Sequence, residues 1–153
     1  MYGLLLLFVI LLLLVLNEFI YIFKGGKKQE NFSNKIKTHT LSVKLANTPY
    51  QRRVGLMFRK EPLLEGYGLL FDYKGFTDAT FWMKNTYIPL DILFLSANKV
   101  ILDYSENNKP LDLRTISSKV KYRYAIELNG GTINKLKMKI GDKIKIKLSA
   151  YNN

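Results

Sequence analysis

The first 23 residues constrain this chain more than any other feature. Tyr2–Phe23 contains thirteen consecutive apolar residues, Leu4–Leu16, followed by Asn17-Glu18 and five more apolar residues. At about 1.5 Å per residue, a helix of this length spans roughly 33 Å, which matches a hydrocarbon core of about 30 Å. The sequence therefore predicts a single transmembrane helix over residues 1–23, with the lipid membrane as a partner through residues 2–23.

A cleaved signal peptide is the rival interpretation of this segment. The leucine-rich run has a suitable length, but no Lys or Arg precedes it and no small-x-small cleavage pattern follows it. An anchor is therefore the favoured interpretation. Lys24, Lys27 and Lys28 flank its C-terminal end. By the positive-inside rule we expect a single-pass membrane protein with its domain on the cytoplasmic side.

Behind the anchor, the charge and the cysteine count narrow the classes of protein. Residues 24–37 are polar and lysine-rich and predict a linker, which leaves 38–150 as one domain. The chain carries +12, mostly from lysines spread along its length, so a nucleic-acid partner is the less favoured explanation of the charge. The absence of cysteine excludes thiol nucleophiles, cysteine zinc fingers and iron–sulfur clusters.

The single histidine excludes metal sites and catalytic motifs that need two histidines. His39 leaves no partner for a paired-histidine metal site or an HExxH motif. No serine lies in a GxSxG elbow, and Gly130-Gly131 lacks the Lys-Ser/Thr that a phosphate loop needs. We therefore expect neither a metal nor a cofactor, and the residues do not decide whether the protein is an enzyme.

Short apolar runs separated by turn residues dominate the domain. Alternating or apolar patterns predict strands over 39–46, 68–73, 79–83, 92–95, 100–102, 122–128 and 143–148. Many short strands of this kind predict a mainly β fold, either a compact β-sandwich or a partly open barrel, with one or two short helices.

One helix has clear start and stop signals. Thr48 is a predicted N-cap, Pro49 the first helical residue, and Gln51 closes a capping box. Gly55 is a suitable residue for the end of the helix because glycine tolerates positive φ. The apolar residues 56–58 that follow are predicted to be in the core.

The second half of the domain yields three further expectations. The runs 92–95 and 100–102 are apolar without a break and predict a hairpin buried on both faces. Thr132, after Gly130-Gly131, is predicted to cap a short helix. Residues 143–148 alternate lysine with Ile or Leu, which is typical of a half-exposed edge strand.

The most chemically varied segment follows the predicted strand at 79–83. Trp82 provides an apolar wall, while Lys84, Asn85 and Thr86 offer directional polar groups. This mixture suits a small-molecule pocket. The alternative is a core Trp followed by a polar turn that caps its own backbone.

Two charged residues elsewhere complete the candidate ligand-binding set. Arg52 has a guanidinium that can fork onto a carboxylate or a phosphate; the alternative is a solvated helix face. Asp91 opens an apolar strand and, if buried, needs a partner, for which Lys84 and Arg52 are candidates. Such a pair could act as an acid or a base, although a structural role is the more common outcome.

Together these motifs resemble the domain of unknown function 192 family. The likeness covers roughly residues 40–148 and rests on RRVGLMFR, GLLF, FWMKNTYIPLDILFL, YAIEL and KIGDKI. The matching positions are Arg52, Gly55, Leu56, Met57, Arg59, Gly68, Phe71, Trp82, Met83, Lys84, Asn85, Thr86, Pro89, Leu90, Asp91, Glu127, Gly131, Gly141 and Asp142. Gln51 and Leu69 stand where the family usually has an acid and a methionine.

The resemblance implies a compact β-sandwich-like domain, often behind a signal or anchor, and it implies no activity. Three functions stay open from the residues. The first is a binding or accessory module for a small polar ligand or peptide near Arg52, Trp82, Lys84, Asn85, Thr86 and Asp91. The second is an enzyme with an Asp/Lys/Arg acid–base site. The third is a structural or assembly scaffold.

Overall fold

The computed structural model describes residues 12, 13, 16 and 35–149. The chain divides into two compact units, Met1–Lys35 and Ile36–Asn153, and all the named strands belong to the second. Most of the predicted transmembrane helix (1–23) and of the predicted linker (24–37) lies outside the described residues. Within the described ranges, no helix has both the length and the apolar character needed to cross a membrane.

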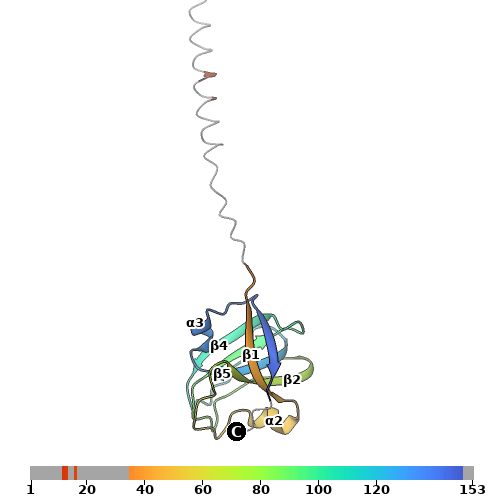
Figure 1. Cartoon of the computed structure of the whole chain (residues 1–153), viewed down its shortest axis with the longest axis vertical. Helices are drawn as coiled ribbons and strands as arrows, with labels where there is room; N and C mark the ends of the chain where they lie inside the picture. The colour runs from red at the N-terminus through yellow and green to blue at the C-terminus, as the bar shows by residue number, and fades with distance from the viewer. Residues whose placement is uncertain (1–11, 14–15, 17–34, 150–153) are drawn as a thin grey trace, which may run out of the picture. The chain divides into compact units, whose positions relative to one another are not determined.

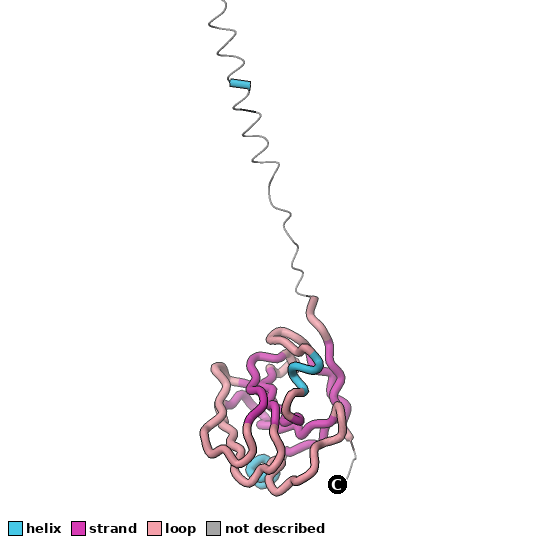
Figure 2. The backbone as a smooth tube through the Cα atoms, turned by 90° about the vertical axis from the view of Figure 1, so that its left-hand side faces the viewer, coloured by secondary structure: helices cyan, strands magenta, loops and turns pink. Residues whose placement is uncertain are grey.

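The second unit is a mainly β domain with two short helices (Figures 1 and 2). Its elements in chain order are β1 (Thr38–Ala46), α2 (Pro49–Val54), β2 (Tyr67–Thr77), β3 (Leu90–Leu95), β4 (Ile101–Asn108), β5 (Tyr122–Asn129), α3 (Thr132–Leu136) and β6 (Lys143–Leu148). The two helices lie at opposite ends of the sheet in both views.

The described strands form one curled, six-stranded sheet in the order β4-β3-β5-β2-β1-β6. β1 pairs in parallel with both β2 and β6, whereas the other pairs are antiparallel. At one end a single bridge joins Val100 to Lys143, next to a hydrogen bond of 2.8 Å from the Ile101 N–H to the Asp142 carbonyl. The two edge strands therefore meet at that end, and the predicted partly open barrel fits this arrangement better than a two-sheet sandwich.

Alternation along the strands gives the sheet two apolar faces. One face carries a core of Leu41, Val43, Leu70, Leu93, Leu95, Ile126 and Leu128, which Ile133 of α3 and Met138 cover. The opposite face carries Ala46, Leu69, Phe71, Ile92, Phe94 and Ala125, which Phe81 and the half-buried Leu56 and Ile116 cover. All six residues of β3 are buried, because this strand has neighbours on both edges and cover on both faces.

Helix α2 forms as its sequence predicts. The Thr48 hydroxyl accepts a hydrogen bond of 3.1 Å from the Gln51 N–H, and the Gln51 side chain accepts one of 3.1 Å from the Thr48 N–H. The helix ends at Gly55 with φ of 52°. One prediction after it is wrong: Phe58 is 61% exposed, because the turn holds it at φ of 65°, where its N–H bonds the Asn85 carbonyl.

Helix α3 begins differently from the prediction. Its N-cap is Gly131 at φ of 84°, and Thr132 is the first helical residue and makes no side-chain cap. The Thr132 hydroxyl instead donates a bond of 2.7 Å to the Asn129 carbonyl. The helix N-terminus is capped by Asp91 on β3, whose carboxylate accepts bonds of 3.0 Å from the Gly131 N–H and 2.8 Å from the Ile133 N–H.

Two strand predictions need correction. Residues 79–83 form only one bridge, between Phe81 and Ile116, because the segment at 116 is their sole ladder partner among the described residues. The predicted strand at 100–102 extends much further, as β4 continues to Asn108 through two irregularities in its pairing with β3. β4 is also an edge strand and only partly buried, whereas two-sided burial was expected.

Strand β6 matches its prediction as an edge strand with outward lysines. Lys143, Lys145 and Lys147 are exposed, while Ile144 between them is buried. At the start of this strand His39 and Asp142 form a bond of 2.9 Å, and the carboxylate also accepts from the Lys37 and Lys139 N–H groups. Burial raises the pKa of Asp142, but these hydrogen bonds outweigh it and hold the pKa below its usual value.

Candidate functional site

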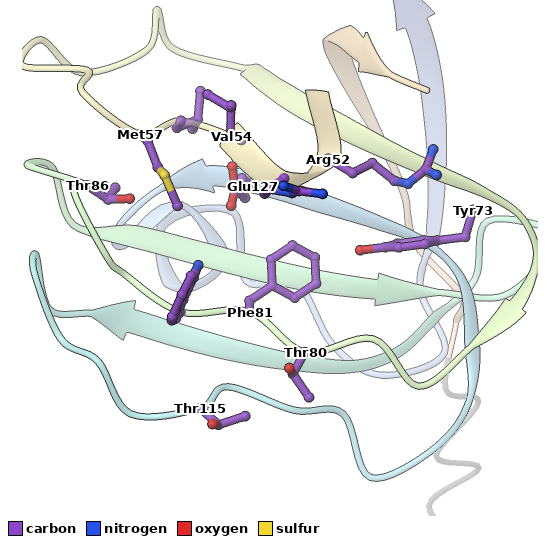
Figure 3. A pocket seen from close by; sticks show the side chains of 13 residues that line it. Arg52, Val54, Met57, Tyr73, Thr80, Phe81, Thr86, Thr115 and Glu127 are labelled. Carbon is purple, nitrogen blue, oxygen red and sulfur yellow. The ribbon is translucent and has the colours of Figure 1, made fainter. Parts of the chain in front are cut away.

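An open cavity of about 340 Å³ lies against the face of the sheet that carries Phe71 and Phe94 (Figure 3). Its walls come from α2 and the turn after it (residues 52–57), from Tyr73 of β2, from the segment 80–82, and from Thr86, Thr115 and Glu127. We call it the Glu127 cavity. Its volume is at the lower end of the roughly 300–1,000 Å³ that is usual for small-molecule sites.

The β alternation of β5 places Glu127 in this cavity. Its neighbours Ile126 and Leu128 point into the core on the opposite face, so the Glu127 side chain points toward the cavity face. In the sheet Glu127 lies between Leu69 on β2 and Ile92 on β3, two buried apolar residues. The carboxyl therefore sits on an apolar floor, and only 6% of the residue is exposed.

The Glu127 carboxyl is only half satisfied by the protein. It accepts a hydrogen bond from the Leu56 backbone N–H, whereas its Oε2 atom has no partner among the described residues. Burial raises the pKa of Glu127 to about 8, and the Leu56 bond offsets a small part of this rise. At neutral pH this carboxyl is therefore mostly protonated.

Gly55 lets the turn after α2 come this close to the carboxyl. A Cβ at this position would lie 3.1 Å from Oε2 of Glu127 and 3.4 Å from the Phe71 ring. Its backbone conformation, with φ of 52° and ψ of −127°, is one that residues other than glycine rarely adopt. The end of the helix therefore delivers the Leu56 N–H to Glu127.

The two adjacent arginines of α2 have different surroundings. Arg52 donates from Nη1 to the Asn47 carbonyl at 2.7 Å and to the Asp72 carbonyl at 3.0 Å, and its guanidinium lies 5.4 Å from the centre of the Tyr73 ring. These contacts tie α2 to β2, and Figure 3 shows Arg52 beside Tyr73 at one side of the cavity. Arg53 also lines the cavity but is exposed, with no hydrogen bond or ion pair to another described residue.

Aromatic rings form the wall opposite α2. Phe81 is buried and meets Phe71 edge-on, with ring centres 5.1 Å apart. Trp82 is 46% exposed at the cavity mouth, and the Lys84 ammonium lies 5.0 Å from the centre of its ring. Met57 and Thr86 lie together at the side away from Arg52 and Tyr73 (Figure 3).

The structure brings three of the six sequence-predicted residues to this cavity. Arg52, Trp82 and Thr86 line it. Lys84 and Asn85 are not part of the lining. Lys84 lies over the Trp82 ring, and the carbonyl of Asn85, a residue with φ of 55°, accepts a hydrogen bond of 2.7 Å from the Phe58 N–H.

Asp91 lies on the other face of the sheet. Its neighbour Ile92 shares the Glu127 face, so Asp91 points the opposite way, toward α3. The carboxylate is 0% exposed and accepts three backbone bonds, from Asn107, Gly131 and Ile133. Its partners are therefore backbone amides and not Lys84 or Arg52, the two partners that the sequence suggested. The side chain is closed off from solvent.

Glu127 is the residue that the candidate set omitted. It lies in the motif YAIEL, which resembles the family, and it is absent from the residues predicted to bind a ligand. The available signal was a lone acid within the apolar run of β5, where alternation requires burial. Among the described residues, no three carboxylate or imidazole side chains gather to hold a metal ion.

Comparisons with known proteins place this geometry in a family. Residues 32–146 match the family described as DUF192, uncharacterized ACR. A crystal structure from Sinorhizobium meliloti, described as a candidate transcription regulator, is 40% identical with a TM-score of 0.65, covering 67% of this chain and 79% of that one.

A second crystal structure, of a protein of unknown function from Novosphingobium aromaticivorans, is 36% identical with a TM-score of 0.64, covering 67% of this chain and 73% of that one. The search of curated proteins found no match. Because the family match spans most of the chain, this protein belongs to the domain of unknown function 192 family.

Proposed function

We propose that the domain is a binding module that takes a small polar molecule into the Glu127 cavity. The observation that carries this proposal is the Glu127 Oε2 atom, which is buried, faces an open cavity and has no partner among the described residues. Buried polar atoms are almost always hydrogen-bonded, and an exception calls for an explanation such as a role in function. A bound molecule with a polar group would satisfy Oε2, by accepting from the protonated carboxyl or by donating to the carboxylate.

A purely structural role explains this carboxyl less well. Its one bond to the Leu56 N–H would be made equally well by a neutral amide, at no risk of burying a charge. Burying an acid against Leu69 and Ile92 costs stability. A ligand that forms a hydrogen bond with the carboxyl would offset this cost. Strained and unsatisfied groups of this kind are concentrated at functional sites.

We also propose that residues 1–23 hold this module at a membrane. The support is the apolar run Leu4–Leu16 and its length, together with the lysines that follow and favour a cytoplasmic domain. Alkaline carbonate extraction of membranes tests the anchor. The full chain should stay in the pellet, a variant lacking residues 1–23 should not, and protease added to sealed vesicles should report the side.

The binding proposal can be tested with the chain's only tryptophan. Trp82 lines the cavity, so its fluorescence reports binding there without a label. The purified chain would be titrated with a panel of small polar compounds: L-amino acids, dicarboxylates, carboxamides and monosaccharides. We expect at least one class to shift the emission and to raise the melting temperature.

Glu127→Gln and Glu106→Gln form the matched pair of variants for this experiment. Both remove one carboxylate, but Glu106 is exposed on β4 and outside the Glu127 cavity. Loss of the response only in Glu127→Gln supports the proposal. A panel with no response in the unmodified chain, or a response that survives Glu127→Gln unchanged, contradicts it.

A second candidate function is acid–base catalysis by Glu127. The observation that favours it is a carboxyl with a pKa of about 8 that faces a cavity. A general acid or base works best when its pKa lies near the ambient pH. Conversion of a bound compound, followed by NMR, separates the two functions. Catalysis requires turnover that falls much more than affinity in Glu127→Gln.

A further inference from the structure

We infer that the group seated on Glu127 is an organic cation, a guanidinium or ammonium group that a side chain separates from the carboxylate of the same small molecule. This inference names the ligand class of the Glu127 cavity and therefore rests on the proposed function. It follows from the combination of one acid, several aromatic rings and one free guanidinium around a single space.

The inner part of the cavity has the chemistry of a cation site. Oε2 of Glu127 has no hydrogen-bond partner among the described residues, and Phe81 lines the same cavity. Tyr73 and Trp82 add two more rings to the lining, and Met57 adds a polarisable thioether. Aromatic faces attract cations, so these walls add to the attraction of the carboxylate for a cation.

The chain itself demonstrates that two of these rings accept cations. The Arg52 guanidinium lies 5.4 Å from the Tyr73 ring centre, and the Lys84 ammonium lies 5.0 Å from that of Trp82. Neither cation neutralises Glu127, because no ion pair or hydrogen bond joins them to it in the described part of the chain. The carboxyl at the floor is thus left for a cation from outside.

The rim explains why the ligand should carry a carboxylate as well. Arg53 lines the cavity, is exposed and has no acidic partner among the described residues. The chain carries a formal charge of +12, which disfavours the approach of a bare amine. A zwitterionic molecule resolves this conflict, since its carboxylate can meet Arg53 while its cationic end reaches Glu127.

Binding of such a cation should release a proton. Before a cation binds, the carboxyl is mostly protonated at neutral pH, because its pKa is raised to about 8. When a guanidinium N–H bonds Oε2, the Glu127 O–H proton leaves to the buffer and the carboxylate pairs with the cation. Affinity should therefore rise with pH toward about 8 and then level off.

L-Arginine and L-citrulline are the probes that test this inference. They share the backbone and chain length, but the citrulline ureido group is neutral. The full chain in detergent would be titrated calorimetrically at pH 7 in phosphate and in Tris, whose different ionisation enthalpies reveal proton transfer. We expect arginine to bind about 10–100-fold more tightly, as is usual for one charge-assisted bond, and to release close to one proton.

Variants link the preference to the carboxyl. Glu127→Gln should reduce the arginine preference to less than about twofold and abolish proton release, whereas Glu106→Gln should keep both. Arg53→Gln should weaken the binding of arginine. It should leave the binding of methylguanidinium unchanged, because methylguanidinium has no carboxylate. Since proton release is measured on the unmodified chain, the test does not depend on any variant folding.

The outcomes separate this inference from the proposed function. If citrulline binds as tightly as arginine, or no proton is released, the ligand class is wrong while a Glu127-dependent response to any panel compound still supports the site. If no compound of the panel binds, the proposed function fails, and this inference with it.

Discussion

Gly55 and Glu127 approach each other so closely that a Cβ on Gly55 would lie 3.1 Å from Oε2 and 3.3 Å from Oε1 of the carboxyl. The end of α2 therefore packs directly against the carboxyl at the floor of the cavity, and the positions of the two depend on each other. The turn cannot be altered without moving the acid, and the acid cannot be replaced by a larger group without moving the turn.

Gly55→Ala should lower the free energy of unfolding by roughly 2–4 kcal/mol, because backbone strain adds to the contact with Glu127. Urea denaturation measures this loss. Gly66→Ala is the control for strain alone, since Gly66 has φ of 77° but nothing within 4 Å of its Cβ position. Gly75→Ala, with open space and no positive φ, should change stability little. Equal losses at positions 55 and 66 would contradict the contact.

Glu127 should make stability depend on pH between its usual pKa of 4.5 and about 8. In this window the folded protein keeps a proton that the unfolded chain has released, so stability falls as pH rises, by about 1.4 kcal/mol per unit. Glu127→Gln lacks this slope. The difference in unfolding free energy between the two chains should grow in favour of the variant from pH 5 to pH 8 and then stay constant; a flat difference contradicts the buried acid.

Asp91→Asn should destabilise the fold by at least about 3 kcal/mol, because it weakens the bonds that one buried carboxylate makes to three backbone amides at once. The loss should appear in the denaturation midpoint. Binding in the Glu127 cavity should persist in the fraction that is folded, since Asp91 lies on the opposite face of the sheet. If the folded Asp91→Asn chain no longer binds the ligand, Asp91 takes part in binding and this prediction is wrong.

Arg52→Ala and Arg53→Ala should behave differently although they are adjacent. Arg52 bonds the Asn47 and Asp72 carbonyls, so its loss should cost about 1–3 kcal/mol and loosen α2. Arg53→Ala should change stability by less than about 0.5 kcal/mol. Chemical denaturation of both variants measures the two values, and a similar cost for the two would mean that Arg52 does not hold the helix.

The sequence predicted best those features that neighbouring residues determine. The capping box of Thr48 and Gln51 and the end of α2 at Gly55 depend on a few adjacent residues, and both occur as expected. The alternation of β6 likewise gave its exposed lysines and buried Ile144. Features of this kind need no knowledge of the rest of the fold.

Features set by distant partners were missed for a physical reason. The cap of α3 comes from Asp91, about 40 residues earlier, so Thr132 was chosen from local chemistry alone. Residues 79–83 have strand-like composition, but only one bridge to Ile116 is available to them. Glu127 became a site residue only once the end of α2 was seen to pack over it, which no periodicity in β5 reveals.

The position of β1 between β2 and β6 has a consequence for how the domain folds. β1 pairs in parallel with β2 on one edge and with β6 on the other, and 105 residues separate Lys37 from its partner Asp142. During synthesis the first strand must therefore wait, with one edge open, until nearly the last residue of the domain has left the ribosome. Contacts this distant slow folding, so the final step should be the docking of β6, with His39 and Asp142 closing the register.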